Sequence, residues 1–142
     1  MKLPDANVLI YAQNADLPQH ARCRRWLETA LSGNETIGFS WLVIVAFVRL
    51  TTSVHVLRDP LSSIEAIDIA RGWLEQPCAA TIEPGPDHLD HLGAMLGVAG
   101  MAGRLTTDAH LAAIASELGA TVVSCDTDFL RFPDLRVFDP TR

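Results

Sequence analysis

Short apolar runs alternate along this chain with longer segments in which apolar residues recur every third or fourth position. Turn-forming residues such as Pro, Gly and Asp bound the short runs, which is typical of strands. The pattern predicts strands at residues 2–5, 36–40, 79–84, 121–125 and 136–139. The first of them ends at Asp5, and Asp126 and Asp128 directly follow the fourth.

The longer segments predict helices. Residues 18–32 are the clearest case, since Cys23, Trp26, Leu27, Ala30 and Leu31 recur at helical spacing. Other helices are expected at 6–12, 41–50, 62–76, 87–98 and 106–118, with a glycine-punctuated loop at 97–105.

The pattern also predicts which helical residues are buried and where helices end. The segment 41–50 is apolar nearly all round, so we expect a buried helix. The expected inner positions of the last three helices are Ile67, Ala70 and Leu74; Leu89, Leu92, Gly93 and Leu96; and Leu111, Ile114, Ala115 and Leu118. Ser62 or Ser63 and Thr106 or Thr107 are the predicted N-caps, and Gly119 the predicted end of the last helix.

Strands that alternate with helices imply βαβ units and a parallel sheet covered on both faces. We therefore expect an α/β fold of three layers, α/β/α, with a central parallel sheet of about five strands. The chain has 142 residues, 49% of them hydrophobic, and shows no repeat, linker or low-complexity segment. One domain over residues 1–142 is the simplest organisation.

The composition narrows the location of the protein. No apolar run approaches the roughly 20 residues of a membrane span, and the N-terminus does not resemble a signal peptide. Three scattered cysteines support neither a disulfide framework nor a zinc site, and we interpret them as reduced core thiols. We expect a cytoplasmic protein that does not bind a membrane.

The net charge of −6 argues against a nucleic-acid partner, which usually contacts a basic surface. That argument weakens if some carboxylates hold a metal ion. Of the 11 basic residues only Lys2 is a lysine, and arginine is the better bidentate phosphate ligand. The net charge therefore leaves the partner open.

Four aspartates are predicted to converge at one edge of the sheet. Ligands of open α/β sheets lie beyond the carboxyl ends of the strands, where Asp5, Asp126 and Asp128 are placed. Asp108 falls in the first turn of a helix, where the helix dipole favours an anion. Four carboxylates repel one another unless a hard cation binds them, so the pattern predicts a Mg²⁺ or Mn²⁺ site.

Each aspartate also has a plainer interpretation. Asp126 and Asp128 are common turn residues, and Asp108 is a common helix-start residue. Asp5 is harder to explain alone, because within "LPDANVLI" its carboxylate is expected to be partly buried and unpaired. Taken together the four favour the metal, and a carboxylate-bound Mg²⁺ suits the hydrolysis of phosphate esters.

Two motifs carry a resemblance that covers the whole chain. They are "LPDANVLIYA" near the start and "LTTDAHLAAIASELGATVVSCDTDFLRF" near the end. With this length between them, the chain resembles a PIN-domain ribonuclease of the VapC toxin type. The resemblance implies a PIN-like α/β/α fold, usually a homodimer, and cleavage of structured RNA, tRNA or rRNA, with Mg²⁺ or Mn²⁺. It also implies a VapB-type antitoxin as partner.

The resemblance assigns roles to individual residues. Asp5, Asp108 and Asp126 match the metal-binding acids of the family, and Asp128 a further, less constant one. Asn7 and Ser124 match polar positions that hold the carboxylates and water. The family usually has a glutamate followed three residues later by an arginine. In this chain Ala46 stands at the position of the glutamate and Arg49 at that of the arginine. We expect Arg49 to stabilise a carboxylate or contact RNA.

Ala46 departs from the family pattern, and no acid lies between Glu35 and Asp59 to replace the glutamate. Our hypothesis is that the metal site lacks one ligand and binds its ion more weakly, or holds one ion instead of two. The alternative function is a catalytically impaired PIN-like domain that serves as an antitoxin- or RNA-binding module.

Other motifs have competing interpretations. A haloacid dehalogenase-type site needs D-x-D after the first strand and a lysine, and the chain has D-x-N there and only Lys2. "GVAGMAG" lacks the G-K-[ST] ending of a nucleotide loop. His88 and His91 indicate a solvated helix face or a surface metal clip, and His110 a contact to RNA or antitoxin. The arginines at 22, 24 and 25 form either a solvated face or an RNA-binding surface.

Overall fold

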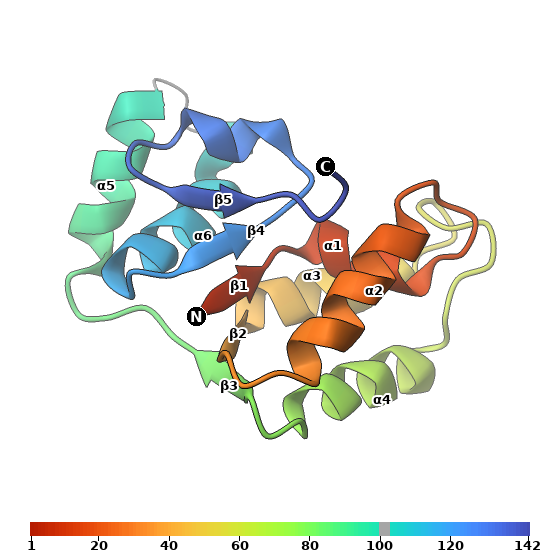
Figure 1. The fold of residues 1–142 in the computed structure, drawn as a ribbon. Helices are drawn as coiled ribbons and strands as arrows, with labels where there is room; N and C mark the ends of the chain where they lie inside the picture. Colours follow the sequence, from red (N-terminus) through yellow and green to blue (C-terminus); the bar gives the residue numbers. More distant parts are fainter. Residues whose placement is uncertain (100–102) are drawn as a thin grey trace.

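The protein is built around a five-stranded sheet in which every neighbouring pair of strands is parallel. The computed structural model describes residues 1–99 and 103–142. The strands are β1 (Lys2–Pro4), β2 (Ile37–Ser40), β3 (Ala79–Ile82), β4 (Thr121–Val123) and β5 (Arg136–Phe138). Their order in the sheet is β3-β2-β1-β4-β5 (Figure 1).

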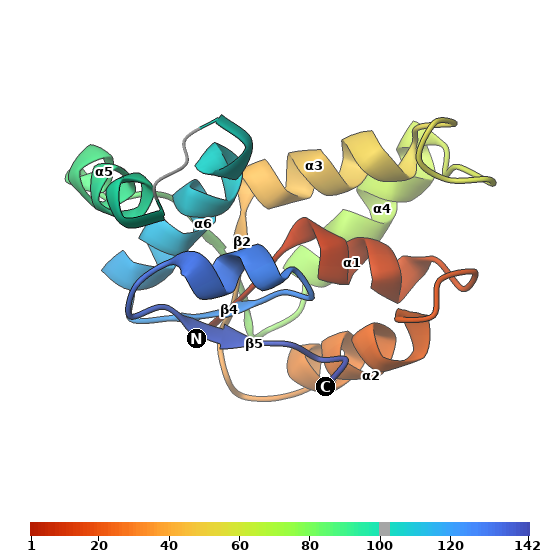
Figure 2. The ribbon, with the colours of Figure 1, turned by 90° about the horizontal axis from the view of Figure 1, so that it is seen from above.

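Helices cover both faces of this sheet. They are α1 (Ala6–Gln13), α2 (His20–Leu31), α3 (Trp41–Thr51), α4 (Ser63–Leu74), α5 (His88–Ala99) and α6 (Thr106–Glu117), with the short 3-10 helices η1 (Gly103–Leu105) and η2 (Thr127–Arg131). Figure 2 shows α2 on one side of the sheet and α3, α5 and α6 on the other. The expected three-layer α/β fold with a parallel sheet is confirmed. None of the helices in the described part of the chain is long and apolar enough to span a membrane.

The strand order changes direction at the centre of the sheet. From β1 the chain moves outward through β2 to β3, and then returns to the other side of β1 for β4 and β5. The direction of winding therefore reverses between β1 and β4. Beyond the carboxyl ends of two such strands lies the usual ligand site of an open α/β sheet.

Strand β2 is buried along its whole length and requires a glycine at its centre. A Cβ atom on Gly38 would lie 2.4 Å from Ile82 Cδ1 and 2.6 Å from Leu3 Cδ2. Side chains of β1 and β3 fill this space, so Gly38 lets the core close over the middle of the sheet.

The helix ends were predicted with mixed success. Ser62 caps α4 through a capping box with Glu65, as expected. Gly119 has φ +58°, and the Ala120 and Gly119 amides donate to carbonyls of the last turn of α6, so the predicted stop is confirmed. The threonine cap of α6 is wrong, because the chain enters this helix through η1 and Leu105 is the N-cap.

Several buried faces were predicted wrongly. The exposed side chains Trp41, Leu42 and Val45 show that α3 is covered on one side only. Leu118, the C-cap of α6, is exposed. Ile67 is also exposed and Leu89 is 80% exposed, because α4 and α5 turn other residues inward. In α4 these are Ala66, Ala70 and Trp73, and Trp73 packs against Phe39 and Phe47; in α5 Met95 is buried. These helices are apolar on more than one face, so spacing alone did not select the buried face.

The expected loop at 97–105 lies partly outside the described residues, at 100–102. Of the remainder, residues 97–99 continue α5 and 103–105 form η1, so the prediction of an irregular loop is wrong there. All three cysteines are free, as expected, and Cys23 is buried in the core.

Candidate active site

Three of the four predicted aspartates gather tightly beyond β4. One carboxylate oxygen each from Asp108, Asp126 and Asp128 lie within 4.8 Å of one another. Asp108 comes from the first turn of α6, and the other two from the start of η2. Asp5 is not part of this tight group, but it lines the same small hollow as Asp108. The structure therefore brings three of the four aspartates together at one edge of the sheet, as predicted, and places Asp5 beside them rather than among them.

Asp5 stands where β1 turns into α1 and caps that helix. Its Oδ1 accepts a hydrogen bond of 2.7 Å from the Ala6 amide, and its Oδ2 accepts from Asn7 Nδ2 at 2.6 Å and Ser124 Oγ at 2.9 Å. The expectation of an unpaired Asp5 is wrong, because its own helix and the β4 loop both donate to it. These bonds fix the direction of the carboxylate.

Asn7 and Ser124 join segments that are far apart in sequence. Asn7 Nδ2 donates to Ser124 Oγ at 2.9 Å, and the Asp126 amide donates to the same oxygen at 3.0 Å. The Cys125 amide donates to Asn7 Oδ1 at 3.3 Å. Since Ser124 is buried, this network holds the end of β1 against the loop after β4. The two residues predicted to support the acids thus contact them.

Two arginines hold Asp128. Arg104 Nη1 lies 2.6 Å from its Oδ2, and Arg131 Nη1 lies 3.5 Å from its Oδ1. The Asp128 amide donates to Asp126 Oδ1 at 2.8 Å. The hydrogen bond from Arg104 keeps the pKa of Asp128 below its usual value. The sequence analysis missed Arg104, because its partner lies 24 residues away and no local spacing joins them.

The pKa of Asp108 is shifted in the opposite direction to that of Asp128. Burial, together with the charges of Asp5, Asp126 and Asp128, raises its pKa to about 6. Burial also raises the pKa of Asp5, although the hydrogen bond from Ser124 opposes this. A divalent cation would relieve the repulsion and favour the ionised form of both groups. The donor set, carboxylate oxygens on a rigid sheet edge, fits Mg²⁺ or Mn²⁺.

Ala46, which replaces the glutamate of the family pattern, faces the same hollow. The hollow has a volume of about 40 Å³, and Asp5, Asp108 and Leu42 line it together with Ala46. An acidic residue at this position would add a carboxylate to a hollow that Asp5 and Asp108 already line. Arg49, predicted to support the site, is exposed in the last turn of α3, and its side chain makes no hydrogen bond or ion pair with any residue of 1–99 or 103–142. The structure does not bring it to the acids.

A second polar cluster extends along α6 from His110 to Glu117 in its last turn. His88 Nδ1 is 2.5 Å from Glu117 Oε1, and His88 Nε2 is 2.8 Å from His110 Nδ1. The Gly85 amide donates to the other oxygen of Glu117 at 2.8 Å. The side chain of His88 is only 12% exposed, so its placement on a solvated face is wrong: α6 covers it. The cluster fastens α5 to α6.

Comparison with known proteins agrees with this geometry. The PIN domain family model matches residues 2–135. Ribonuclease VapC37 of Mycobacterium tuberculosis is 44% identical over 99% of this chain and 97% of its own length, and Ribonuclease VapC33 of the same species is 42% identical over 100% and 99%.

Solved structures share the fold at lower identity. A Rickettsia felis VapBC2 chain, solved with a promoter DNA fragment, has a TM-score of 0.68 at 22% identity, with 97% of both chains covered. Mycobacterium tuberculosis VapC20, described as a Sarcin-Ricin loop cleaving toxin, has a TM-score of 0.68 at 16% identity, with 96% of this chain and 99% of that one covered. The chain therefore belongs to the PIN domain family, and within it to the VapC-type ribonuclease toxins of toxin–antitoxin systems.

Proposed function

We propose that this ribonuclease hydrolyses phosphodiester bonds of structured RNA, tRNA or rRNA, with a Mg²⁺ or Mn²⁺ ion held by Asp5, Asp108 and Asp126. The observation that carries the proposal is the tight group of Asp108, Asp126 and Asp128, with Asp5 beside it. Burial and the charges of the neighbouring aspartates raise the pKa of Asp108 to about 6, and a bound cation would relieve both costs.

Each side chain of the site has a definite task in this proposal. When bound, the metal ion polarises the scissile phosphate and lowers the pKa of an attacking water. Ser124 and Asn7 orient Asp5 by hydrogen bonds, and the Ser124 hydroxyl also fixes the Asp126 amide. Asp128 adds charge or positions water. Arg104, held 2.6 Å from Asp128, places a positive charge at the edge where an RNA phosphate would approach.

The proposal extends to partners. The VapBC pairs among the solved relatives support a VapB-type antitoxin as the inhibitor of this chain, and the description of VapC20 supports a structured RNA as substrate. We also propose that residues 1–142 form one PIN domain, that the protein forms a homodimer, and that it acts on RNA in the cytoplasm.

The test is cleavage of purified tRNA and rRNA by the purified protein with Mg²⁺, Mn²⁺ or EDTA. Asp5→Asn and Asp108→Asn serve as site variants. Asp68→Asn, an exposed aspartate of α4, is the matched control. We expect discrete fragments with either metal, none with EDTA or the site variants, and unchanged cleavage with the control. Cleavage that survives EDTA and both site variants would contradict the proposal.

A second function, binding without catalysis, rests on one observation. Ala46 lines the hollow beside Asp5 and Asp108, where the family pattern has a glutamate. If the protein binds antitoxin or RNA but shows no metal-dependent cleavage, this alternative replaces the first.

A further inference from the structure

Three arginines surround a hollow between α2 and the chain that follows β5. The hollow has a volume of about 470 Å³, and its walls include Arg22, Arg25 and Arg142 together with Trp26 and Phe138. No acidic side chain of the described residues lines it. We call these five residues the arginine groove. On a protein with a net charge of −6, a hollow whose charged lining residues are all cations is unusual.

The arginine groove leads to the acids. Phe138 and Arg142 also line a second hollow, of about 310 Å³, which Ser124 and Asp126 line as well, together with Asp139, the ion-pair partner of Arg142. The two hollows therefore share a wall, and together they run from α2 to the loop that carries Asp126. A chain lying along them would pass from the three arginines to the candidate metal site.

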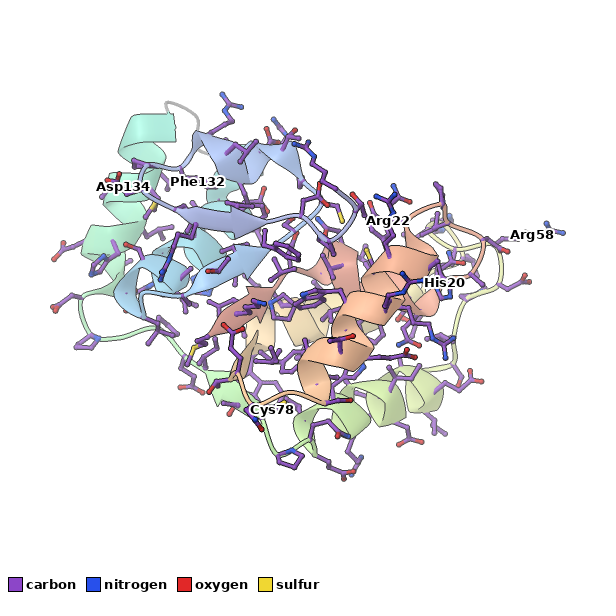
Figure 3. The ribbon with its side chains drawn as sticks, in the orientation of Figure 1. His20, Arg22, Arg58, Cys78, Phe132 and Asp134 are labelled. Atoms are coloured by element: carbon purple, nitrogen blue, oxygen red, sulfur yellow. The ribbon has the colours of Figure 1, made fainter. Side chains whose placement is uncertain are left out.

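The arginines of the groove differ in how far they are engaged. Arg22 donates through Nη1 to the Thr141 carbonyl oxygen, which holds it beside the C-terminal segment (Figure 3). Arg142 is 67% exposed and its Nε lies 3.1 Å from Asp139 Oδ2. Arg25 is exposed, and its side chain makes no hydrogen bond or ion pair within the described chain. All three keep guanidinium N–H groups for a further anion.

The neighbouring arginine provides a contrast. Arg24 is also exposed on α2, but its Nε lies 2.8 Å from Glu28 Oε1 and it lines a different hollow. The helix thus separates a paired arginine from two that face the groove. A binding surface needs arginines that face the ligand. A uniformly solvated helix face would not divide its arginines in this way.

The aromatic residues of the groove suit nucleotide bases. Trp26 is partly buried, and Phe138 is 41% exposed with Lys2 Nζ 5.6 Å from its ring centroid. Because Lys2 already occupies one side of Phe138, we assign the main binding energy to the arginines and a smaller part to base stacking. Cations that follow a backbone, with aromatic rings between them, are typical of single-stranded nucleic-acid grooves.

We propose that the arginine groove binds the ribose–phosphate backbone of the RNA substrate on one side of the cleaved phosphate. The inference rests on the proposed function, since it takes Asp126 as lying at the cleavage point. An acidic segment of an antitoxin has the same charge. RNA is favoured because the groove continues to the acids at which the phosphate would be cut.

The test measures RNA binding separately from cleavage. Fluorescence anisotropy of a fluorescein-labelled, unfractionated tRNA pool in EDTA reports binding without metal-dependent turnover. The variant combines Arg25→Glu and Arg142→Glu, and Arg24→Glu is the control. We expect the variant to bind RNA about tenfold or more weakly, while Arg24→Glu changes the affinity little. The slope of log K against log salt concentration should become shallower by about 0.7 for each lost phosphate contact. In cleavage assays KM should rise and kcat should stay near that of the wild type.

Three results would contradict the proposal that the arginine groove binds RNA. Equal RNA binding by the wild type and the variant is the first. Equal loss of binding with Arg24→Glu is the second, since it would report general charge alone. The third is intact RNA binding with lost antitoxin binding, which would assign the groove to the antitoxin. The failure of the proposed function is distinguishable, because it would leave RNA binding sensitive to Arg25 and Arg142 in a protein that does not cleave.

Discussion

The two ends of α6 carry carboxylates in opposite circumstances. Asp108, in the first turn, has a pKa raised to about 6 by burial and by neighbouring aspartates. Near the last turn, burial alone would raise the pKa of Glu117, but hydrogen bonds from His88 and the Gly85 amide outweigh it and hold the pKa below its usual value. The helix dipole alone would favour the reverse, an anion at the N-terminus and not at the C-terminus.

The difference shows how local partners decide the role of an acid. Glu117 is complete within the fold, because the groups that neutralise it come from the chain itself. Among the described residues the carboxylate of Asp108 accepts no hydrogen bond, and the charge of Arg104, which is bonded to Asp128, only partly offsets the effects that raise the pKa of Asp108. A positive charge from outside would complete the neutralisation. We therefore interpret one end of α6 as a structural fastening and the other as a binding site.

The largest expected effect separates the two ends by activity. Asp108→Asn should reduce RNA cleavage by more than about 100-fold, since a metal ligand should matter more than the outer-shell groups that cost 10–100-fold. Glu117→Gln should leave cleavage within a few fold and instead lower the free energy of unfolding by about 1–2 kcal/mol, through weaker hydrogen bonds. Cleavage rates and urea unfolding of both variants check this. Loss of cleavage in Glu117→Gln, with the fold intact, would break the comparison.

Metal affinity should depend on pH through Asp108. The ion needs the ionised carboxylate, so its apparent affinity should fall by about tenfold per pH unit below about pH 6 and level off above it. Titration calorimetry with Mn²⁺ between pH 5 and 8 measures this. In Asp108→Asn the residual binding should lose this dependence; an unchanged pH profile would mean that another group controls the site.

Thermal stability without metal should respond in opposite directions at the two ends. The folded pKa of Asp108 is raised, so its charge destabilises the protein as pH rises from about 4 to 6, and Asp108→Asn should raise Tm by a few degrees at pH 7.5 but not at pH 4. The folded pKa of Glu117 is lowered, so its contribution is present above its ordinary pKa and is lost as pH falls through the folded value. Glu117→Gln should therefore lower Tm at pH 7.5, with the difference shrinking in acid. Melting curves in EDTA test both signs.

The smallest expected effect concerns the missing acid. Ala46→Glu adds a carboxylate to the hollow beside Asp5 and Asp108, so Mg²⁺ should bind severalfold more tightly. Ala46→Gln, of similar shape without the charge, is the control. Calorimetry that finds unchanged or weaker Mg²⁺ binding in Ala46→Glu would refute the idea that the site lacks one ligand.

What could be predicted from sequence follows from the range of each signal. The strands, the parallel sheet and the convergence of the aspartates follow from local pattern and the strand-end rule, and the structure has them as expected. The side-chain contacts around α6 could not be predicted in this way. Arg104 and Asp128 are 24 residues apart in the sequence, and His88 and Glu117 are 29 residues apart. No periodicity joins such pairs.

The helix faces failed for a different reason. Ile67 and Leu89 are apolar residues on helices that are apolar on more than one side, so the sheet and the neighbouring helices decided which side is buried. The arginine groove likewise depends on α2 lying against the segment after β5, a contact between the first and last quarters of the chain.

The most direct test of the account is a crystal structure of the protein soaked in Mn²⁺, with the ion located by its anomalous scattering. We predict a peak about 2.0–2.2 Å from carboxylate oxygens of Asp108 and Asp126, and no peak at His88, His110 and Glu117. A fully occupied ion at the cluster of His88, His110 and Glu117, or none near Asp108 at saturating Mn²⁺, would contradict the assignment of the aspartates as the metal site of this ribonuclease.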